Sequence, residues 1–285
     1  MYPKLLLSVV LCTIIKIENN RRTAMIKIIA TDMDGTLLDD EKQLPSNFED
    51  VISDLSRRKI NFVISSGRSF NVLKKQFTRH IDDLTFICDN GAYIVVGGKN
   101  IYTSVIDRQT VTDIIDRCEK LGYTLILCGK KGAWHNASEE SQNKEISNYY
   151  VCQTYLKDLH DCTDEIFKVA IFKEDGFSNA QYEALSDCFA DRCNVLLSGS
   201  HWVDIMNKGV SKGSALSTIC NRFGVGYNEV MAFGDYLNDV DMLNCAYYSF
   251  AMSNAHSSVK QVANFITGSN NDNSVMKEVT KYCLQ

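Results

Sequence analysis

Four aspartates occur in two short segments of this chain, and their spacing could build a site for a divalent cation. Asp32-Met-Asp34-Gly-Thr36 forms the first segment, and Gly234-Asp235-Tyr-Leu-Asn238-Asp239 forms the second. Carboxylates that share a site repel one another unless a positive charge lies between them. Mg²⁺ suits such a site because it is a hard cation that proteins hold with one or two carboxylates plus water and substrate phosphate. We therefore predict a Mg²⁺ site made from Asp32, Asp34, Asp235 and Asp239.

Two further segments carry groups that bind phosphate oxygens. Ser66-Gly-Arg68 offers a hydroxyl donor, and Lys212-Gly213 offers a mobile positive charge. A site needs such groups to hold phosphate oxygens and to neutralise charge in a transition state. Each of the four segments alone could be an ordinary turn, loop or helix start. Their occurrence in this order, each at the expected boundary of a strand or helix, favours one common site for phosphate chemistry.

The stretches between these segments alternate between strand-like and helix-like patterns. Short apolar runs predict buried strands at 26–30, 61–65 and 85–88, and apolar residues at helical spacing predict helices near 46–55 and 70–77. Such alternation predicts parallel pairing, and therefore an α/β domain with a Rossmann-like parallel sheet. The carboxyl ends of parallel strands form the ligand crevice of such a sheet, so the four segments can meet there.

The pattern changes in the middle of the chain and returns near its end. Residues 93–106 are typical of an antiparallel hairpin, whereas the helix expected at 212–223 and the strand at 229–233 restore the first rhythm. Between them the sequence predicts helices at 108–121 and 179–190 and strands at 123–128, 167–172 and 195–197. We therefore predict an α/β core domain of residues 25–92 and 198–285, with an α+β domain inserted at residues 93–197.

These segments together resemble a known family. DMDGTLL, SSGR, the Lys212-Gly213 pair and FGDYLND are similar to the four signature motifs of the haloacid dehalogenase superfamily, specifically its Cof-type phosphatases. Asn90-Gly-Ala92 and Ala251-Met-Ser-Asn-Ala255 add local matches, and the resemblance extends from Met25 nearly to the C-terminus. It implies a phosphatase whose insertion is the type C2 cap of that family.

The resemblance also implies a role for each motif residue. Asp32 is expected to attack phosphorus and form an aspartyl-phosphate, while Asp34 protonates the leaving oxygen and later activates water. Mg²⁺ is expected to bind the side chains of Asp32 and Asp235 and the main-chain carbonyl of Asp34, with Asp239 as a further ligand or water-holder. The phosphate-binding residues implied in the same way are Ser66, Lys212 and Asn238.

The cap is expected to close over the site, exclude bulk water and contact the leaving group. Candidate specificity residues are Arg68 in the core and a polar and aromatic group in the insertion, namely Lys130, Lys131, Trp134 and His135. A solvent-exposed turn with Trp134 packed on the cap is an equally open interpretation of that group. Sugar phosphates are the favoured substrate class, and pyridoxal phosphate and flavin precursors are the alternatives.

Other activities are weighed against a phosphatase. A phosphotransferase or phosphomutase would use the same aspartyl-phosphate and differ only in whether water or a second alcohol accepts the phosphoryl group. A dehalogenase fits poorly, because halide displacement needs neither a metal nor an acid at Asp34. An inactive phosphometabolite-binding protein fits poorly as well, since it would normally lack at least one of four residues that are all present here: Asp32, Asp34, Lys212 and Asp235.

The composition is that of an ordinary globular protein, with 45% apolar and 23% charged residues in 285 positions. A net charge of -5 without a cluster of Lys or Arg argues against nucleic-acid binding. The 11 cysteines are scattered without a Cys-x-x-Cys pair, which argues against a disulfide framework or a zinc site. They favour a reducing cytoplasmic location, where the expected partner is a small phosphorylated metabolite.

The N-terminal 24 residues lie outside these patterns. Leu5 to Ile15 is an apolar run that is too short to span a bilayer, and the polar stretch after it offers no small-residue cleavage site. We expect residues 1–24 to be an upstream extension outside the fold, with no membrane partner, and a secreted form is the alternative. The sequence leaves the oligomeric state open.

Overall fold

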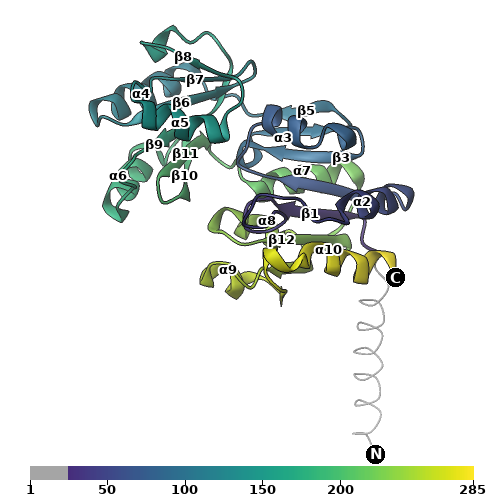
Figure 1. Ribbon diagram of the computed structural model, residues 1–285. Helices are drawn as coiled ribbons and strands as arrows, with labels where there is room; N and C mark the ends of the chain where they lie inside the picture. The colour runs from purple at the N-terminus through teal and green to yellow at the C-terminus, as the bar shows by residue number, and fades with distance from the viewer. Residues whose placement is uncertain (1–24) are drawn as a thin grey trace, which may run out of the picture.

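A computed structural model describes residues 25–285, which form two lobes that lie side by side (Figure 1). The expectations about residues 1–24 fall outside the described residues. Within residues 25–285, no helix is long and apolar enough to cross a membrane.

The larger lobe, the core, is built on an eight-stranded sheet. Its strands are β1 Ile28–Asp32, β2 Asn61–Ser65, β3 Leu84–Cys88, β4 Tyr93–Val96, β5 Lys99–Thr103, β12 Val230–Gly234, β13 Tyr248–Ala251 and β14 Phe265–Ile266. They follow the order β14-β13-β12-β1-β2-β3-β4-β5, with parallel pairing from β14 to β3 and antiparallel pairing of β4 and β5. The central strands are buried apolar runs, as expected for a sheet covered on both faces.

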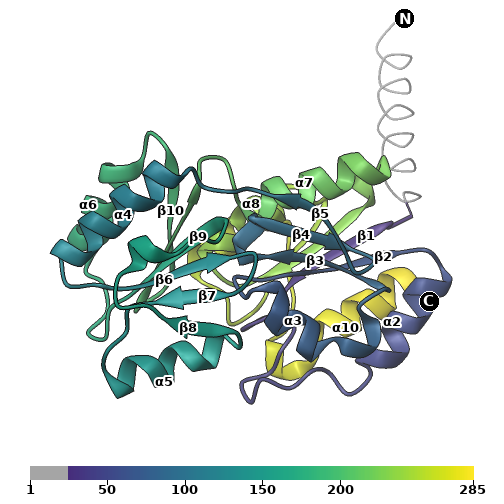
Figure 2. The same ribbon diagram turned by 90° about the horizontal axis from the view of Figure 1, so that it is seen from above.

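Helices cover both faces of the core sheet. Their bounds are α2 Phe48–Arg57, α3 Phe70–Gln76, α7 Lys212–Phe223, α8 Val240–Asn244, α9 Ser257–Val262 and α10 Ser274–Val279. Figure 2 shows α2, α3 and α10 on one face and α7 and α8 on the other. Helix α7 begins after Ser211, whose side chain accepts a hydrogen bond from the backbone of Ser214, and it ends at Gly224 in the left-handed region. These caps satisfy its end groups and so place Lys212 in the first turn.

The smaller lobe, the cap, has a six-stranded sheet of its own. Its elements are α4 Arg108–Lys120, β6 Thr124–Gly129, β7 Ala133–His135, α5 Glu140–Tyr149, β8 Gln153–Tyr155, β9 Ile166–Phe172, α6 Asn179–Phe189, β10 Cys193–Gly199 and β11 Trp202–Asn207, with strand order β10-β11-β9-β6-β7-β8. Side chains alternate along β9, so Val169 and Ile171 pack with α4 and α6 while Ala170 and Phe172 pack on the side of α5. Figure 2 shows the same division of the helices.

The predicted fold class is confirmed, but the domain boundaries shift at both ends of the insertion. The hairpin of β4 and β5, predicted to lie in the insertion, extends the core sheet because β4 pairs with β3 and buries Ile94 and Val95 in the core cluster. Strand β11, predicted to lie in the core, belongs to the cap because it pairs with β10 and β9. The cap sheet therefore runs from β6 to β11, and the predicted bounds 93–197 are wrong.

Candidate active site

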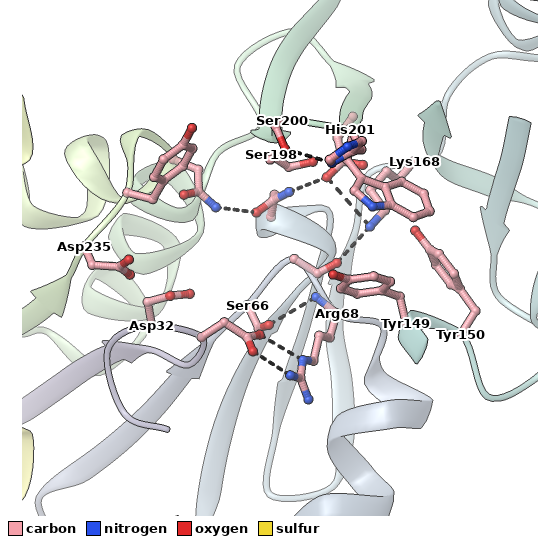
Figure 3. A pocket seen from close by; sticks show the side chains of 18 of the residues that line it. Asp32, Ser66, Arg68, Tyr149, Tyr150, Lys168, Ser198, Ser200, His201 and Asp235 are labelled. Atoms are coloured by element: carbon pink, nitrogen blue, oxygen red, sulfur yellow. Dashed lines mark hydrogen bonds and ion pairs between the residues drawn. The ribbon is translucent and has the colours of Figure 1, made fainter. Parts of the chain in front are cut away.

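The four predicted segments meet where the parallel strands of the core sheet end. Asp32 is the last residue of β1 and lies beside Ser65, the last residue of β2. On the other side β1 pairs with β12, and Asp235 directly follows that strand. The side chain of Lys212 reaches the same place from α7. Figure 3 shows Asp32, Ser66 and Asp235 gathered on the core side of one pocket.

A buried lysine joins two of the carboxylates. The side chain of Lys212 is only 1% exposed, and its Nζ donates to Oδ1 of Asp32 at 2.5 Å and to Oδ1 of Asp239 at 2.6 Å. Burial opposes the charged form, yet the negative charges of Asp239 and Asp32 raise the pKa of Lys212 above its usual value. The lysine is therefore a fixed positive charge beside Asp32.

Asp239 holds the loop that carries Asp235. Its Oδ2 accepts hydrogen bonds from the backbone N–H groups of Asp235 and Tyr236, at 3.0 and 3.1 Å, while Oδ1 accepts from Lys212. Both carboxylate oxygens of this fully buried side chain therefore have protein partners. Asp239 therefore fixes the turn after β12 and positions Lys212.

Asp235 is oriented by the first motif. Thr36 Oγ1 donates to Asp235 Oδ1 at 2.8 Å. Gly35 has a φ of +78°, and a Cβ at this position would lie 2.5 Å from Asp235 Oδ2. Only glycine therefore allows the backbone of the first motif to approach the Asp235 carboxylate this closely.

The carboxylates fit a hard divalent cation. Asp32, Asp235 and Asp239 each offer an oxygen, and these oxygens lie within 4.8 Å of one another. Burial and the nearby charge of Asp239 raise the pKa of Asp32 well above its usual value and that of Asp235 to about 6. Burial and the charge of Asp239 together thus outweigh the effect of Lys212, so a bound cation would stabilise the ionised carboxylates.

Asp34 has different partners from the other aspartates. Arg68 donates to both of its carboxylate oxygens, at 2.7 and 3.0 Å, and Lys42 Nζ donates at 2.9 Å. Partial burial would raise the pKa of Asp34, but the charge and hydrogen bonds of Arg68 and those of Lys42 hold it below the usual value. Arg68, predicted as a specificity residue, therefore contacts Asp34 and also lines the pocket.

The two remaining polar residues of the motifs lie in buried or half-buried loops. Ser66 is buried, and its Oγ accepts a hydrogen bond from the backbone N–H of Arg68 at 3.1 Å. Asn238 Nδ2 donates to Oδ1 of Asn90 at 3.1 Å. Both Ser66 and Asn238 line the pocket, together with Asp32 and Asp235.

The pocket is a cavity of about 880 Å³ between core and cap. Figure 3 shows Tyr149, Tyr150 and His201 on the side opposite Asp32. The cap residues that line it come from the end of α5 and the residue after it, from β9, from the end of β10 and the turn that follows, and from β11; they are Glu145, Tyr149, Tyr150, Lys168, Ser198, Gly199, Ser200, His201, Trp202 and Asp204. Trp202 packs against Phe172 and Tyr149, with ring centroids 4.8 and 5.4 Å apart. The cap side of the pocket is therefore aromatic and hydroxyl-bearing.

The cap group predicted from the sequence is not part of this lining. Lys130 forms an ion pair with Glu165 at 3.5 Å, the backbone of Lys131 and Trp134 Nε1 both donate to Asp164, and His135 is buried with its Nδ1 accepting from the backbone of Ala137. Strand β7 lies near the edge of the cap sheet remote from β10 and β11. The structure therefore does not bring these four residues to the pocket. The Ser198-Gly-Ser-His201 segment lines the cap side of the pocket instead.

Comparison with known proteins settles the family. A family model described as haloacid dehalogenase-like hydrolase matches residues 29–279. The chain belongs to the haloacid dehalogenase-like hydrolases. Membership explains why the four segments meet at these strand ends, and it confirms the superfamily predicted from the motifs.

Relatives of this family match nearly the whole chain. The 5-amino-6-(5-phospho-D-ribitylamino)uracil phosphatase YbjI of Escherichia coli (strain K12) is 29% identical over 259 residues, covering 90% of this chain and 96% of the relative. The solved structure of SMU.1108c from Streptococcus mutans UA159 is 30% identical with a TM-score of 0.85, covering 91% of this chain and 100% of its own. That of TM0651 from Thermotoga maritima is 27% identical with a TM-score of 0.77, covering 90% and 97%. These matches confirm the predicted fold and enzyme class, a phosphatase of this family.

Proposed function

We propose that this protein is a Mg²⁺-dependent phosphatase that hydrolyses phosphate monoesters of small metabolites through an aspartyl-phosphate on Asp32. The observation that carries the proposal is the cluster of Asp32, Lys212, Asp235 and Asp239, in which Asp32 and Asp235 line the pocket between core and cap and the buried Lys212 and Asp239 lie behind them. No ordinary surface site combines a carboxylate of raised pKa with a fixed lysine and further carboxylates.

Asp32 is the nucleophile in this proposal. Its carboxylate lines the pocket and is fixed by Lys212 at 2.5 Å, so one oxygen is held while the carboxylate faces the cavity. Attack on phosphorus breaks the bond to the leaving oxygen and forms the acyl phosphate. Lys212 offsets negative charge as the phosphoryl group arrives, and Ser66 donates its hydroxyl to a phosphoryl oxygen.

Asp34 is the proton carrier. It protonates the leaving oxygen in the first step and takes a proton from the attacking water in the second. Its ion pairs with Arg68 and Lys42 favour the carboxylate form, which is the form needed to activate water. A substrate phosphate that attracts Arg68 and Lys42 would weaken those ion pairs and favour the protonated form needed for the first step.

The metal would be held by the side chains of Asp32 and Asp235 and the main-chain carbonyl of Asp34. When bound, Mg²⁺ supplies positive charge that neutralises the phosphoryl oxygens during transfer. The raised pKa values of Asp32 and Asp235 support this assignment, because burial and the charge of Asp239 disfavour their ionised forms and a bound cation would favour them.

Sugar phosphates are the proposed substrate class. Ser198, Ser200 and His201 offer hydrogen-bonding groups suited to a polyhydroxylated leaving group. A flavin precursor is the second candidate, because Tyr149 and Trp202 present aromatic rings to the same pocket. The relative YbjI, named as a phosphatase of a phosphoribitylamino-uracil, supports that second candidate. Both classes join a phosphate to a hydroxylated chain.

The test is a screen of phosphorylated metabolites with purified protein, scored by phosphate release with and without a chelator. We expect Mg²⁺-dependent release that is fastest for a sugar phosphate or a phosphoribityl compound, and no release by Asp32→Asn. Phosphate transfer to added sugar in preference to water would replace the hydrolase with a phosphotransferase. Undiminished release after complete metal removal would overturn the metal assignment.

A further inference from the structure

A buried lysine of the cap reaches into the core, and the mechanism above does not use it. Lys168 lies in β9 with a side chain that is 2% exposed. Its Nζ donates to the main-chain oxygen of Gly67 at 2.8 Å and forms an ion pair with Asp89 at 3.0 Å. Gly67 and Asp89 belong to the core, so both contacts cross from one lobe to the other. Lysines are seldom buried unless their charge is paired, and here the charge of Lys168 is paired with a residue of the other lobe.

The Gly67 oxygen belongs to the peptide that orients Ser66. A trans peptide is planar, so its C=O and N–H groups point in opposite directions and turn together. The N–H at the other end of the Gly67–Arg68 peptide donates to Ser66 Oγ at 3.1 Å. By holding the Gly67 oxygen, Lys168 therefore also fixes the direction of the Arg68 N–H. Because this N–H donates to Ser66 Oγ, the hydroxyl proton of Ser66 is free to point toward another acceptor.

A second bridge from the cap reaches the loop that carries Asp235 and Asn238. Asp204 of β11 accepts a hydrogen bond from Asn90 Nδ2 at 2.7 Å, and Oδ1 of Asn90 accepts from Asn238 at 3.1 Å. Oδ2 of Asp204 lies 3.9 Å from Nζ of Lys168, so the two bridges belong to one cluster of buried charges. Asp89 and Asn90 hold left-handed backbone with φ of 49° and 54°, a conformation that non-glycine residues adopt only where their surroundings fix it.

We propose that Lys168 is a positioning residue through which the cap sets the geometry of the Ser66 phosphate-binding loop. The phosphate site is then complete only when the cap lies in the position seen here, and movement of the cap away from the core breaks the bond to Gly67 and loosens the hold on phosphate. The cap thus contributes to phosphate release as well as to leaving-group recognition. This inference rests on the proposed phosphatase function, because it takes Ser66 as a phosphate ligand.

The test measures binding of inorganic phosphate to the full chain in Mg²⁺ buffer by calorimetry, alongside kcat and KM for p-nitrophenyl phosphate. Lys168→Met retains the length of the side chain and removes the donor. We expect its dissociation constant for phosphate to rise about tenfold, with a matching rise in KM. Lys173→Met, just beyond the end of β9, removes a half-buried cap lysine that pairs with Asp175, and this variant is expected to bind phosphate as the wild type does.

A second variant separates positioning from fold stability. Lys168→Met leaves Asp89 and Asp204 buried without their cation, whereas Lys168→Met with Asp89→Asn removes one of these charges and protects folding. The double variant still lacks the bond to Gly67, so weakened phosphate binding in it supports the proposal. Wild-type phosphate binding in either folded variant, even with a lowered melting temperature, would overturn it. Failure of the wild-type chain to bind phosphate or hydrolyse any ester would instead overturn the proposed function.

Discussion

At the scale of single residues, the site is a balance of buried charges that the protein leaves incomplete. Lys212 pairs directly with Asp32 and Asp239, whereas Asp235 forms no direct ion pair with it; burial and the charge of Asp239 raise the pKa of Asp235 to about 6, although the Thr36 hydroxyl and the charge of Lys212 lower it. A carboxyl whose pKa is raised in the folded state binds more protons when folded than when unfolded. Ionisation of these carboxyls therefore lowers the free energy of unfolding, unless a cation binds between them.

This balance predicts how Mg²⁺ affects stability. For Asp235, the folded pKa of about 6 exceeds the usual 3.8, so the metal-free protein loses stability as pH rises through that interval, and the loss is complete above it. Mg²⁺ binds the ionised form and should restore that stability. We expect Mg²⁺ to raise the melting temperature more at about pH 7 than at about pH 5. An equal rise at both values, or none, would contradict the assignment of Asp235 as a ligand.

At the scale of elements, the ends of β1, β2 and β12 and the start of α7 bring the candidate site residues together. The motif residues follow buried apolar runs in the sequence, and strand ends in a parallel sheet meet at one place. The core site could therefore be predicted from the sequence alone, apart from contacts such as that between Arg68 and Asp34. Those depend on side-chain directions that no spacing in the sequence reports.

Gly35 provides a prediction at this scale. Gly35→Ala should cost about 1–2 kcal/mol of stability from its left-handed backbone, and its methyl group should also displace Asp235. We expect Mg²⁺ affinity and kcat/KM to fall roughly tenfold or more, because changes to groups that orient a metal ligand typically lower metal affinity or activity by this much.

The matched control is Gly209→Ala. Gly209 has a φ of +80°, but a Cβ there would meet nothing within 4 Å. It should show the backbone cost without the loss of Mg²⁺ affinity. Equal Mg²⁺ affinity in the two variants would mean that the close approach of Gly35 to Asp235 has no role in the site.

At the scale of the whole molecule, the pocket lies between two lobes, and this is where sequence reasoning failed. The turn Ser198-Gly-Ser-His201 carries the glycine and serine signal of a tight connection, yet the expected end of the insertion at Leu197 excluded it from the cap. The polar and aromatic group at 130–135 was locally conspicuous, but β7 lies near the edge of the cap sheet remote from β10 and β11, and none of these residues lines the pocket. Which side of a lobe faces its neighbour is decided by long-range sheet order, and periodicity within one strand does not encode it.

The cap turn can be tested by comparing two substrates. His201→Ala should lower kcat/KM for the best metabolite by a factor equivalent to about 1–3 kcal/mol and leave p-nitrophenyl phosphate nearly unaffected, since the nitrophenyl leaving group lacks the hydroxyl groups of a sugar or ribityl chain. His160→Ala removes another cap histidine, which pairs with Asp158 and Asp116 and does not line the pocket, and should affect neither substrate. Equal losses on both substrates would show that His201 is not a specificity residue.

The central claim is that Asp32 carries the phosphoryl group during turnover. The direct measurement uses the Asp34→Asn variant, in which the acyl phosphate should form from an activated ester but hydrolyse slowly. Reduction of the quenched enzyme with borohydride converts a phosphorylated aspartate to homoserine, and peptide mass spectrometry locates it. We expect homoserine at position 32 only in substrate-treated, Mg²⁺-loaded protein. Modification at another residue, or none while the variant still turns over substrate, would contradict it.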